Sequence, residues 1–361
     1  MRIAQVAPLY ESCPPRLYGG TERVVSYVTE ELVRLGHEVT LFASGDSRTS
    51  ASLEAGCEMA LRLDDRCTDP LVYHLIMLGR LRRRADEFDI IHFHTDYLHF
   101  PLFADCWEKT LTTLHGRLDM PDLPVMMREY EMMPLVSISD AQQAPIPWAN
   151  WCATVQHGLP RNLHQLGNGG GGYLGFLGRI SPEKAPDRAI EIARRSGLPL
   201  KIAAKVDRVD QEYYENKIVP LLRDPSINFI GEIGEADKTE FLGNAMALLF
   251  PIDWPEPFGL VLIEAMANGT PVIAFGHGSV PEIIEDGVTG FIVDDIEGAA
   301  AAVPLALRLD RRAIRACFEE RFTTERMARD YLALYQRALS RHSAPLRLVG
   351  ATGSALRESA D

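Results

Sequence analysis

The sequence predicts an α/β protein of two domains, each built on a parallel sheet wound by helices. Short apolar and β-branched runs alternate with helical patterns along most of the chain, which is typical of parallel strands joined by crossover helices. The length of 361 residues also exceeds what one hydrophobic core usually organises. A glycine-rich segment at residues 166–172 separates two halves, and we expect a cleft between them.

The first half is expected to hold strands at residues 3–7, 39–42, 90–93, 111–114, 135–138 and 153–155, each a short apolar run bounded by turn residues. A helix is predicted from Thr21, directly after Gly19 and Gly20. The apolar run 71–78 precedes a basic cluster, Arg80 to Arg84, which predicts another helix. This cluster is interpreted as a solvated helix end, with contact to anionic lipid as the alternative.

The second half is expected to hold strands at residues 173–177, 200–204, 227–230, 247–250, 272–275 and 290–293. Residues 323–339 read as a terminal helix. We therefore expect an N-terminal domain at 1–165, a C-terminal domain at 166–322, a terminal helix at 323–341 and a flexible tail at 342–361. The glycines at 166–172 are interpreted as a linker compatible with a hinge.

Two carboxylates flank the start of an apolar helix in the segment 255–269. Prolines and the pair Phe258-Gly259 keep Glu256 in a loop, whereas Glu264 falls on the second turn of a helix that begins at Leu260. The glutamates are eight positions apart, a separation of about 12 Å or less along a helix. This length suits a sugar nucleotide, because a carboxylate at each end can accept hydroxyl groups and the free helix-start N–H groups can face a diphosphate. The alternative is two solvated glutamates.

A second signal for phosphate binding comes earlier, where a strand runs into a turn and a helix. Arg179 lies at the carboxyl end of the strand and Lys184 near the start of the next helix. Both can converge on an anion outside the sheet edge, where open α/β sheets bind ligands, and neutralise a diphosphate leaving group. The alternative is a pair of exposed cations at a surface turn.

These segments resemble a known family. Residues 178–184 (GRISPEK) and 256–267 (EPFGLVLIEAMA) closely resemble the C-terminal half of the GT-B glycosyltransferases of family 4, the retaining glycosyl transferases group 1. Residues 1–8, 18–22, 89–94, 113–116 and 276–284 resemble its other motifs, so the resemblance covers about residues 1–340. It implies a GT-B fold, with two Rossmann-like domains facing across a cleft, and a terminal helix that crosses back to the first domain. The first domain would bind the acceptor and the second the nucleotide-sugar donor.

The resemblance also implies roles for residues of the first half. Gly19 and Gly20 would face the diphosphate and the donor sugar, although a lone Gly-Gly is more often a turn. The inner-strand histidine of the family matches His115 best and His94 second, and such a histidine could bind the donor sugar or the acceptor. Where the family often reads V-x-N-G-I-D, residues 154–159 read TVQHGL, which puts the contacts of that asparagine in doubt. The aromatic, proline-rich loop 10–18 is an acceptor-selecting loop or an ordinary long connection.

A metal site is the disfavoured interpretation of His92, His94 and His99 beside Asp96. The chain has no D-x-D triplet that would hold a divalent ion on a nucleotide diphosphate, and Arg179 and Lys184 can balance that charge. We therefore expect no metal and no cofactor, and keep His94 and Asp96 as candidates for the acceptor side.

Composition excludes several classes of protein. A net charge of -13 argues against nucleic acid as a partner. The six cysteines show no C-x-x-C pairing, which is typical of free thiols in a reducing compartment. No apolar run approaches the length of a transmembrane helix and no signal peptide is evident, so a cytoplasmic protein is expected.

The sequence therefore predicts a retaining, metal-independent glycosyltransferase that uses a nucleotide diphosphate sugar, with UDP expected as the nucleotide. The acceptor stays open between a sugar, a lipid-linked molecule and another small molecule. The predicted catalytic residues are Arg179, Lys184, Glu256 and His115, and the predicted donor-binding residues are Gly19, Gly20, Phe258, Gly259, Leu260 and Glu264. No residue reads as a covalent nucleophile, so a same-face reaction assisted by the leaving phosphate is expected. The alternatives are a nucleotide-sugar epimerase and a non-catalytic sugar-nucleotide binding protein.

Overall fold

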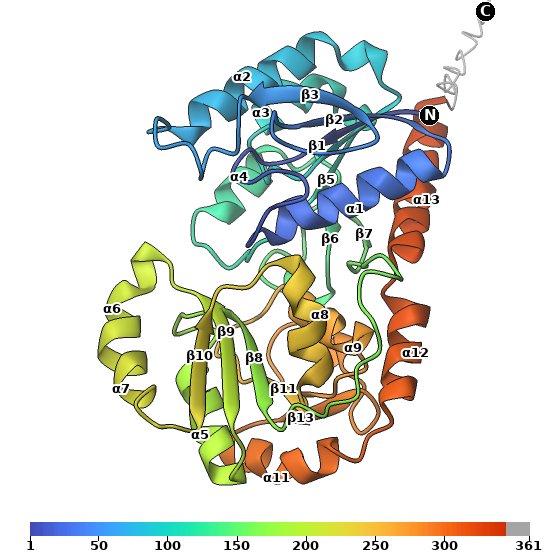
Figure 1. Cartoon of the computed structure of the whole chain (residues 1–361). Helices are drawn as coiled ribbons and strands as arrows, with labels where there is room; N and C mark the ends of the chain where they lie inside the picture. The colour runs from blue at the N-terminus through green and yellow to red at the C-terminus, as the bar shows by residue number, and fades with distance from the viewer. Residues whose placement is uncertain (344–361) are drawn as a thin grey trace, which may run out of the picture.

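The computed structural model describes residues 1–343, with side chains described to residue 340, and forms two α/β domains, one above the other in Figure 1. The N-terminal domain holds a parallel sheet of seven strands in the order β3-β2-β1-β4-β5-β6-β7. The C-terminal domain holds a parallel sheet of six strands in the order β10-β9-β8-β11-β12-β13. The predicted fold class of two parallel-sheet domains is confirmed.

The N-terminal domain contains a strand that sequence patterns missed. β3 forms the outer edge of the sheet and has no β-branched residue, so it gave no strand signal. The strands of this domain are β1 (Arg2–Val6), β2 (Glu38–Ser44), β3 (Ser52–Cys57), β4 (Ile90–Phe93), β5 (Thr110–Thr113), β6 (Leu135–Ser137) and β7 (Trp151–Thr154). Its helices are α1 (Gly20–Arg34), α2 (Pro70–Arg83), α3 (Phe100–Phe103) and α4 (Leu123–Glu129), with short turns η1 (Ala85–Glu87), η2 (Ala104–Lys109) and η3 (Ala141–Gln143).

The six strands predicted for the second half are all present. They are β8 (Leu174–Arg179), β9 (Leu200–Lys205), β10 (Ile227–Gly231), β11 (Ala247–Phe250), β12 (Val272–Phe275) and β13 (Gly290–Val293). The helical elements are α5 (Pro186–Ser196), η4 (Arg208–Asp210), α6 (Gln211–Tyr213), η5 (Tyr214–Ile218), α7 (Val219–Leu221), α8 (Glu235–Asn244), α9 (Leu260–Ala267), α10 (Val280–Ile283), α11 (Ile296–Ala306), α12 (Arg311–Arg321) and α13 (Thr324–Ser343).

Each sheet reverses its strand order beside its first strand. β1 pairs with β2 on one side and β4 on the other, and β8 pairs in the same way with β9 and β11. Connections leave in opposite directions at such a point, so a crevice opens at the carboxyl ends of these strands. The two crevices of this protein face each other across the domain boundary.

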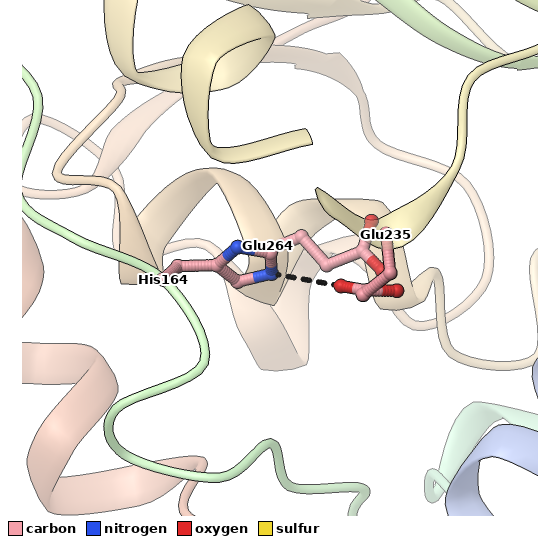
Figure 2. A group of neighbouring side chains, drawn as sticks. All are labelled: His164, Glu235 and Glu264. Atoms are coloured by element: carbon pink, nitrogen blue, oxygen red, sulfur yellow. Dashed lines mark ion pairs between the residues drawn. The ribbon is translucent and has the colours of Figure 1, made fainter. Parts of the chain in front are cut away.

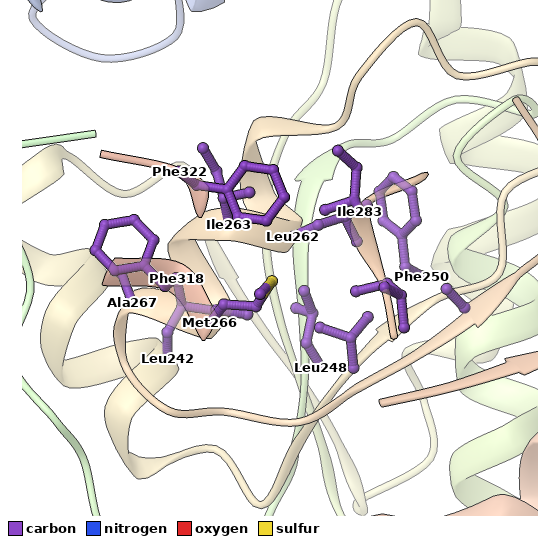
Figure 3. Close-up of a cluster of buried hydrophobic side chains, with 14 of the residues drawn as sticks. Leu242, Leu248, Phe250, Leu262, Ile263, Met266, Ala267, Ile283, Phe318 and Phe322 are labelled. Carbon is purple, nitrogen blue, oxygen red and sulfur yellow. The ribbon is translucent and has the colours of Figure 1, made fainter. Parts of the chain in front are cut away.

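The helix that carries Glu264 is anchored by an apolar core. The residues labelled in Figure 3 come from β11, α8, α9, α10 and the end of α12, and all belong to one buried cluster. Leu262, Ile263 and Met266 have no exposed surface, so α9 is held along its inner face by the core. This packing holds the amino end of α9 at the cleft.

The chain crosses between the domains twice, and the two crossings pair with each other. The N–H of Leu159 donates to the carbonyl of Phe322, and the N–H of Thr324 donates to the carbonyl of Leu159. A side chain at Gly158 would place its Cβ 2.3 Å from the carbonyl oxygen of Thr323, so glycine permits this close approach. α13 then lies against α1 of the N-terminal domain, where Tyr331 is fully buried.

The glycine-rich segment 166–172 is not the hinge that its composition suggested. Gly167, Gly169 and Gly171 donate N–H hydrogen bonds to carbonyls of the C-terminal domain. A Cβ at Gly167 would lie 2.1 Å from the oxygen of Gly243, so these glycines serve close packing rather than flexibility. The crossings near residues 158 and 323 are the places where the domains are joined.

Three further expectations concern the chain as a whole. No disulfide joins the six cysteines, which all lie among the described residues. Within residues 1–343, none of the helices combines the length and the apolar character needed to cross a membrane. The tail predicted at residues 342–361 lies outside the described residues from 344 onward.

Candidate functional site

A cleft of about 660 Å³ lies between the two sheets. It is lined by the loops that follow β1, β4 and β5 in one domain and β8, β9, β10 and β11 in the other. Polar contacts bridge the domains around it, including an ion pair of 3.2 Å between Arg117 and Glu183. All ten predicted site residues line this cleft, so the fold brings the two halves of the predicted site together.

Two helices begin at the cleft. Gly20 opens α1 and Leu260 opens α9, and a Cβ at Gly20 would lie 3.4 Å from Cδ1 of Leu260. Gly259 precedes α9 with φ of 83°, a left-handed conformation that favours glycine. The first N–H groups of a helix have no partner within it, so both helix starts offer donors to an anion.

Lys184 and Glu256 form an ion pair inside the cleft. The indole N–H of Trp254 also donates to Glu256 over 3.0 Å, and the Lys184 ammonium lies 5.0 Å from the centre of the Trp254 ring. Sequence patterns predicted Lys184 for the diphosphate and Glu256 for the sugar, as separate groups. Their direct contact shows that each serves as the counter-charge of the other in the structure described here.

Arg179 is surrounded by carboxylates. Its guanidinium lies 2.9 Å from Glu183, 3.7 Å from Asp207 and 3.4 Å from Asp210. Asp207 also pairs with Lys205 over 2.8 Å. Part of the positive charge predicted for a diphosphate is therefore already balanced, and Lys205 adds a second cation at this wall that sequence patterns did not single out.

Glu264 lies in a buried group of charged side chains that spans the domain boundary. It accepts a hydrogen bond of 2.7 Å from Lys238, which also lies 3.2 Å from Glu235. Arg23 of α1 forms an ion pair of 2.5 Å with Glu235. Burial alone would raise the pKa of Glu264, but Lys238, His164 and Arg23 outweigh it and hold the pKa below its usual value. Glu264 is therefore ionised and already paired.

The same group meets one requirement of a metal site. Figure 2 shows His164 from the interdomain segment, Glu235 from the start of α8 and Glu264 from α9, with the His164 ring directed at Glu235. One possible ligand atom of each lies within 4.8 Å of those of the others. Lys238 and Arg23 already supply positive charge to both carboxylates, however. We therefore assign these side chains to an ion-pair group that joins the domains.

A chain of hydrogen bonds leads from α13 to His115. The amide of Gln5 donates to Tyr335 over 2.9 Å, and its oxygen lies 2.9 Å from Nε2 of His94, which must donate. Nδ1 of His94 is then the acceptor for Nε2–H of His115, 2.8 Å away. His115 is left with Nδ1 unprotonated, buried, and without a hydrogen-bond partner among the described residues.

Desolvation keeps this group of histidines neutral. It lowers the pKa of His115 to about 3 and the pKa of His92 and His94 well below the usual value. His92 places its ring nitrogens 2.8 Å from the hydroxyls of Tyr335 and Thr113, and Nε2 of His99 lies 2.9 Å from the hydroxyl of Thr112. The histidines considered as metal ligands are therefore engaged in hydrogen bonds of the N-terminal core.

His157 occupies the position at which the resembled family often has an asparagine. Its ring stacks on His115 with 5.2 Å between centroids and meets Phe258 edge-on at 4.8 Å. Phe258 itself is 2% exposed and packs in the core, so only its backbone can take part in donor binding. An aromatic contact thus fills this position of the cleft.

Asp96 is one of two carboxylates that line the N-terminal wall, with Glu22 as the other. The Asp96 side chain is exposed to the open space of the cleft, and desolvation by the surrounding walls raises its pKa to about 6. Its backbone has φ of 49°, an uncommon value for a residue other than glycine. Tyr10, Leu17 and Tyr18 of the loop 10–18 line the same cleft, as expected for a loop that contacts a ligand.

Sequence patterns missed several residues of the cleft. Trp254 lies two residues before Glu256 and follows β11, so its place at a strand end was a signal that could have identified it. Lys205 is the last residue of β9 and gave the same kind of signal. Lys238 and Arg23 could not have been predicted as cleft residues from the sequence, because they lie on helix faces whose orientation depends on tertiary packing.

Two family models match the chain, one in each domain. Residues 18–153 match Glycosyltransferase Family 4, and residues 164–318 match Glycosyl transferases group 1. Together the two matched segments take in both walls of the cleft.

Known proteins resemble the chain over different extents. The D-inositol 3-phosphate glycosyltransferase of Mycolicibacterium smegmatis is 29% identical over 258 residues, which are 63% of this chain and 55% of that protein. The match therefore spans little more than half of that relative. Sucrose-phosphate synthase from Thermosynechococcus elongatus has a TM-score of 0.76 at 17% identity, covering 94% of this chain and 100% of that one. Anabaena Alr3699/HepE, solved with UDP and glucose, has a TM-score of 0.71 at 18% identity, covering 93% and 99%. These structural likenesses show the fold.

Proposed function

Because this chain belongs to the GT-B glycosyltransferases of group 1, we propose that it transfers a sugar from a nucleotide diphosphate sugar to an acceptor hydroxyl group. The single observation that carries the proposal is the convergence of two helix starts, Lys184 and Glu256 in one cleft between the two sheets. The UDP and glucose in the Anabaena structure make a UDP-sugar the donor to test first.

The diphosphate would lie between the helix starts. The N–H groups before and at Leu260 and those at Gly19 and Gly20 offer fixed donors, and Lys184 and Arg179 offer charge. Such groups need little reorganisation when negative charge develops on the leaving phosphate, and preorganised donors of this kind are worth about 3 to 4 kcal/mol each in other enzymes. The carboxylates around Arg179 hold its guanidinium in place while leaving it at the cleft wall.

Glu256 and Glu264 would bind the two sugars of the donor. Glu256 would share its oxygens between Lys184, Trp254 and hydroxyl groups of the transferred sugar. Glu264 is ionised and borders the cleft through α9, so it suits the vicinal hydroxyls of a ribose. The separation of the glutamates along the chain would place them at opposite ends of a bound diphosphate.

The reaction itself would retain the configuration at the anomeric carbon. The bond between that carbon and the leaving phosphate oxygen breaks, the acceptor oxygen bonds to the same face, and the acceptor proton passes to the departing phosphate. Neutral His115 cannot act as a general acid near neutral pH, because its pKa is lowered to about 3 by desolvation. We therefore propose that His115 shapes the sugar pocket together with the His157 ring.

A donor screen with product analysis tests this function. We expect UDP-sugars to raise the melting temperature of the protein more than GDP- or ADP-sugars, and release of UDP to accelerate when a suitable acceptor is added. Conversion of the donor sugar without any acceptor would instead indicate an epimerase. Tight donor binding without turnover across acceptors would indicate a binding protein.

A further inference from the structure

The outward face of α2 is apolar along its first two turns. Leu71, Val72, Leu75 and Ile76 are between 45% and 48% exposed. The opposite face packs into the N-terminal core through His74, Met77, Leu78 and Leu81. Figure 1 places α2 on the outer side of the N-terminal domain, away from the C-terminal domain. Single exposed apolar residues are ordinary, but a contiguous set on one helix face marks an interaction surface.

The same face becomes basic along its last two turns. At 3.6 residues per turn, Arg80 and Arg83 continue the stripe of the four apolar residues. Neither arginine makes a hydrogen bond or ion pair with the residues that the structure describes. The neighbouring arginines differ, because Arg82 pairs with Asp105 over 2.5 Å and Arg84 pairs with Glu54 over 2.6 Å.

A small cavity accompanies the unpaired arginines. It has a volume of about 210 Å³ and lies between α2 and β3, where Arg80, Arg83 and Arg84 meet Glu54. Glu54 is already paired with Arg84. Arg80 and Arg83 therefore line the cavity without a counter-charge, although the net charge of the chain is -13. A phosphate group would supply the missing negative charge.

We propose that α2 docks on a membrane surface that contains anionic phospholipid. The apolar residues would enter the boundary between headgroups and acyl chains, while Arg80 and Arg83 bind headgroup phosphates. The helix stays folded on its domain during this contact, because its inner face remains buried. The proposal concerns binding at a surface and is independent of the transferase reaction.

A second copy of the chain fits this face less well. In a two-fold dimer with antiparallel α2 helices, Arg80 and Arg83 of one copy would lie over Leu71 and Val72 of the other. Two guanidinium groups would then be buried against apolar side chains, which is costly for unpaired charges. A phospholipid offers phosphate to the two arginines and acyl chains to the four apolar side chains.

The position of the face relates the membrane to the cleft. His74 belongs to α2 and lines the cleft, where its Nε2 accepts the N–H of Leu9 over 2.9 Å. Tyr10, Leu17 and Tyr18 are exposed at the same rim. A membrane in contact with the outward face of α2 would therefore be separated from the N-terminal wall of the cleft by this helix.

Vesicle co-sedimentation tests the proposal with the full chain. We expect it to pellet with vesicles that mix phosphatidylglycerol and phosphatidylcholine and to stay in solution with phosphatidylcholine alone. Binding should weaken as ionic strength rises, because the headgroup attraction is screened. Equal binding to both vesicle types would overturn the role of the arginines, and no binding to either would overturn the proposal.

Paired variants locate the surface. Arg80→Gln with Arg83→Gln should weaken partitioning about 30-fold, at about 1 kcal/mol for each arginine. Leu75→Gln with Ile76→Gln should abolish detectable pelleting. The matched controls are Arg308→Gln with Arg312→Gln and Leu305→Gln with Leu307→Gln, which change exposed residues of the C-terminal domain. Circular dichroism establishes that each variant is folded.

The oligomeric state distinguishes membrane docking from a second copy of the chain bound at the α2 face. The proposal predicts that sedimentation velocity gives the same species for the wild-type chain and for the Leu75→Gln, Ile76→Gln variant. A dimer that this variant converts to a monomer would assign the face to a second copy and overturn membrane docking. Loss of pelleting in the control variants would likewise overturn the assignment to α2.

Discussion

The C-terminal wall of the cleft is crowded with ion pairs, whereas the N-terminal wall includes a group of neutral histidines. Lys184, Arg179 and Lys238 each contact at least one carboxylate on the C-terminal side. On the N-terminal side, His94 and His115 are kept uncharged by burial and by hydrogen bonds that lead to α13. The ion pairs of the C-terminal wall suit a charged ligand, and the neutral histidines of the N-terminal wall suit hydroxyl groups.

The difference also shows how each wall is held in place. Charged side chains at the C-terminal wall are fixed by opposite charges, which a bound diphosphate and sugar can replace in part. Histidines at the N-terminal wall are fixed by hydrogen bonds that lead to the buried side chains of Gln5 and Tyr335. We therefore expect changes to the first wall to alter binding and turnover, and changes to the second to alter stability as well.

The largest expected effect concerns the cations of the C-terminal wall. Lys184→Ala and Arg179→Ala should each lower turnover by a factor of about 100 or more, because each removes positive charge from the leaving phosphate. Steady-state kinetics with circular dichroism checks this result, and Arg195→Ala on the exposed side of α5 serves as the control. A wild-type rate in either folded variant would remove that residue from the site.

The N-terminal wall should make the protein sensitive to acid. The pKa of His115 is lowered from its usual 6.5 to about 3 by desolvation, so the unfolded chain binds a proton that the folded chain does not. Folding stability therefore falls as pH drops below about 6.5, and His115 alone contributes a loss of about 2 kcal/mol from pH 8 to pH 5.

Urea unfolding at both pH values measures this loss. His115→Gln should reduce the difference by that amount, whereas His277→Gln, which changes an exposed histidine, should leave it unchanged. An unchanged pH dependence in His115→Gln would show that burial does not hold this imidazole neutral.

A smaller effect separates the two glutamates. Glu264→Gln should weaken UDP binding about tenfold, because one charge-assisted hydrogen bond to the ribose is worth about 1.5 kcal/mol or more. Glu256→Gln should spare UDP binding and impair transfer, since its partner is the sugar that UDP lacks. Calorimetry with UDP decides the matter, and Glu240→Gln on the outer face of α8 is the control. An equal loss of affinity in both glutamate variants would contradict the division of roles.

Much of this arrangement could be predicted from the sequence, because position along a strand or helix is a local property. Arg179 ends a strand and Glu264 lies on the second turn of a helix, so the rules for open sheets placed both near the same edge. β3 was missed because its sequence has no β-branched residues and little apolar character.

Pairing across the fold could not be predicted. Lys184 and Glu256 are separated by 72 positions, and their contact depends on how two loops meet. Glycine composition was misleading for a related reason. Gly167 and Gly243 approach so closely that no Cβ fits, which the sequence cannot distinguish from a flexible linker.

Calorimetric titration of UDP into the wild-type protein in excess EDTA tests the central claim most directly. If Arg179, Lys184 and the N–H groups at the starts of α1 and α9 balance the diphosphate, UDP should bind with the same affinity in EDTA and in magnesium. The heat of binding should fall sharply in Lys184→Ala. Binding that disappears in EDTA and returns with magnesium or manganese would contradict the account, because a cation would then do the work assigned to these residues.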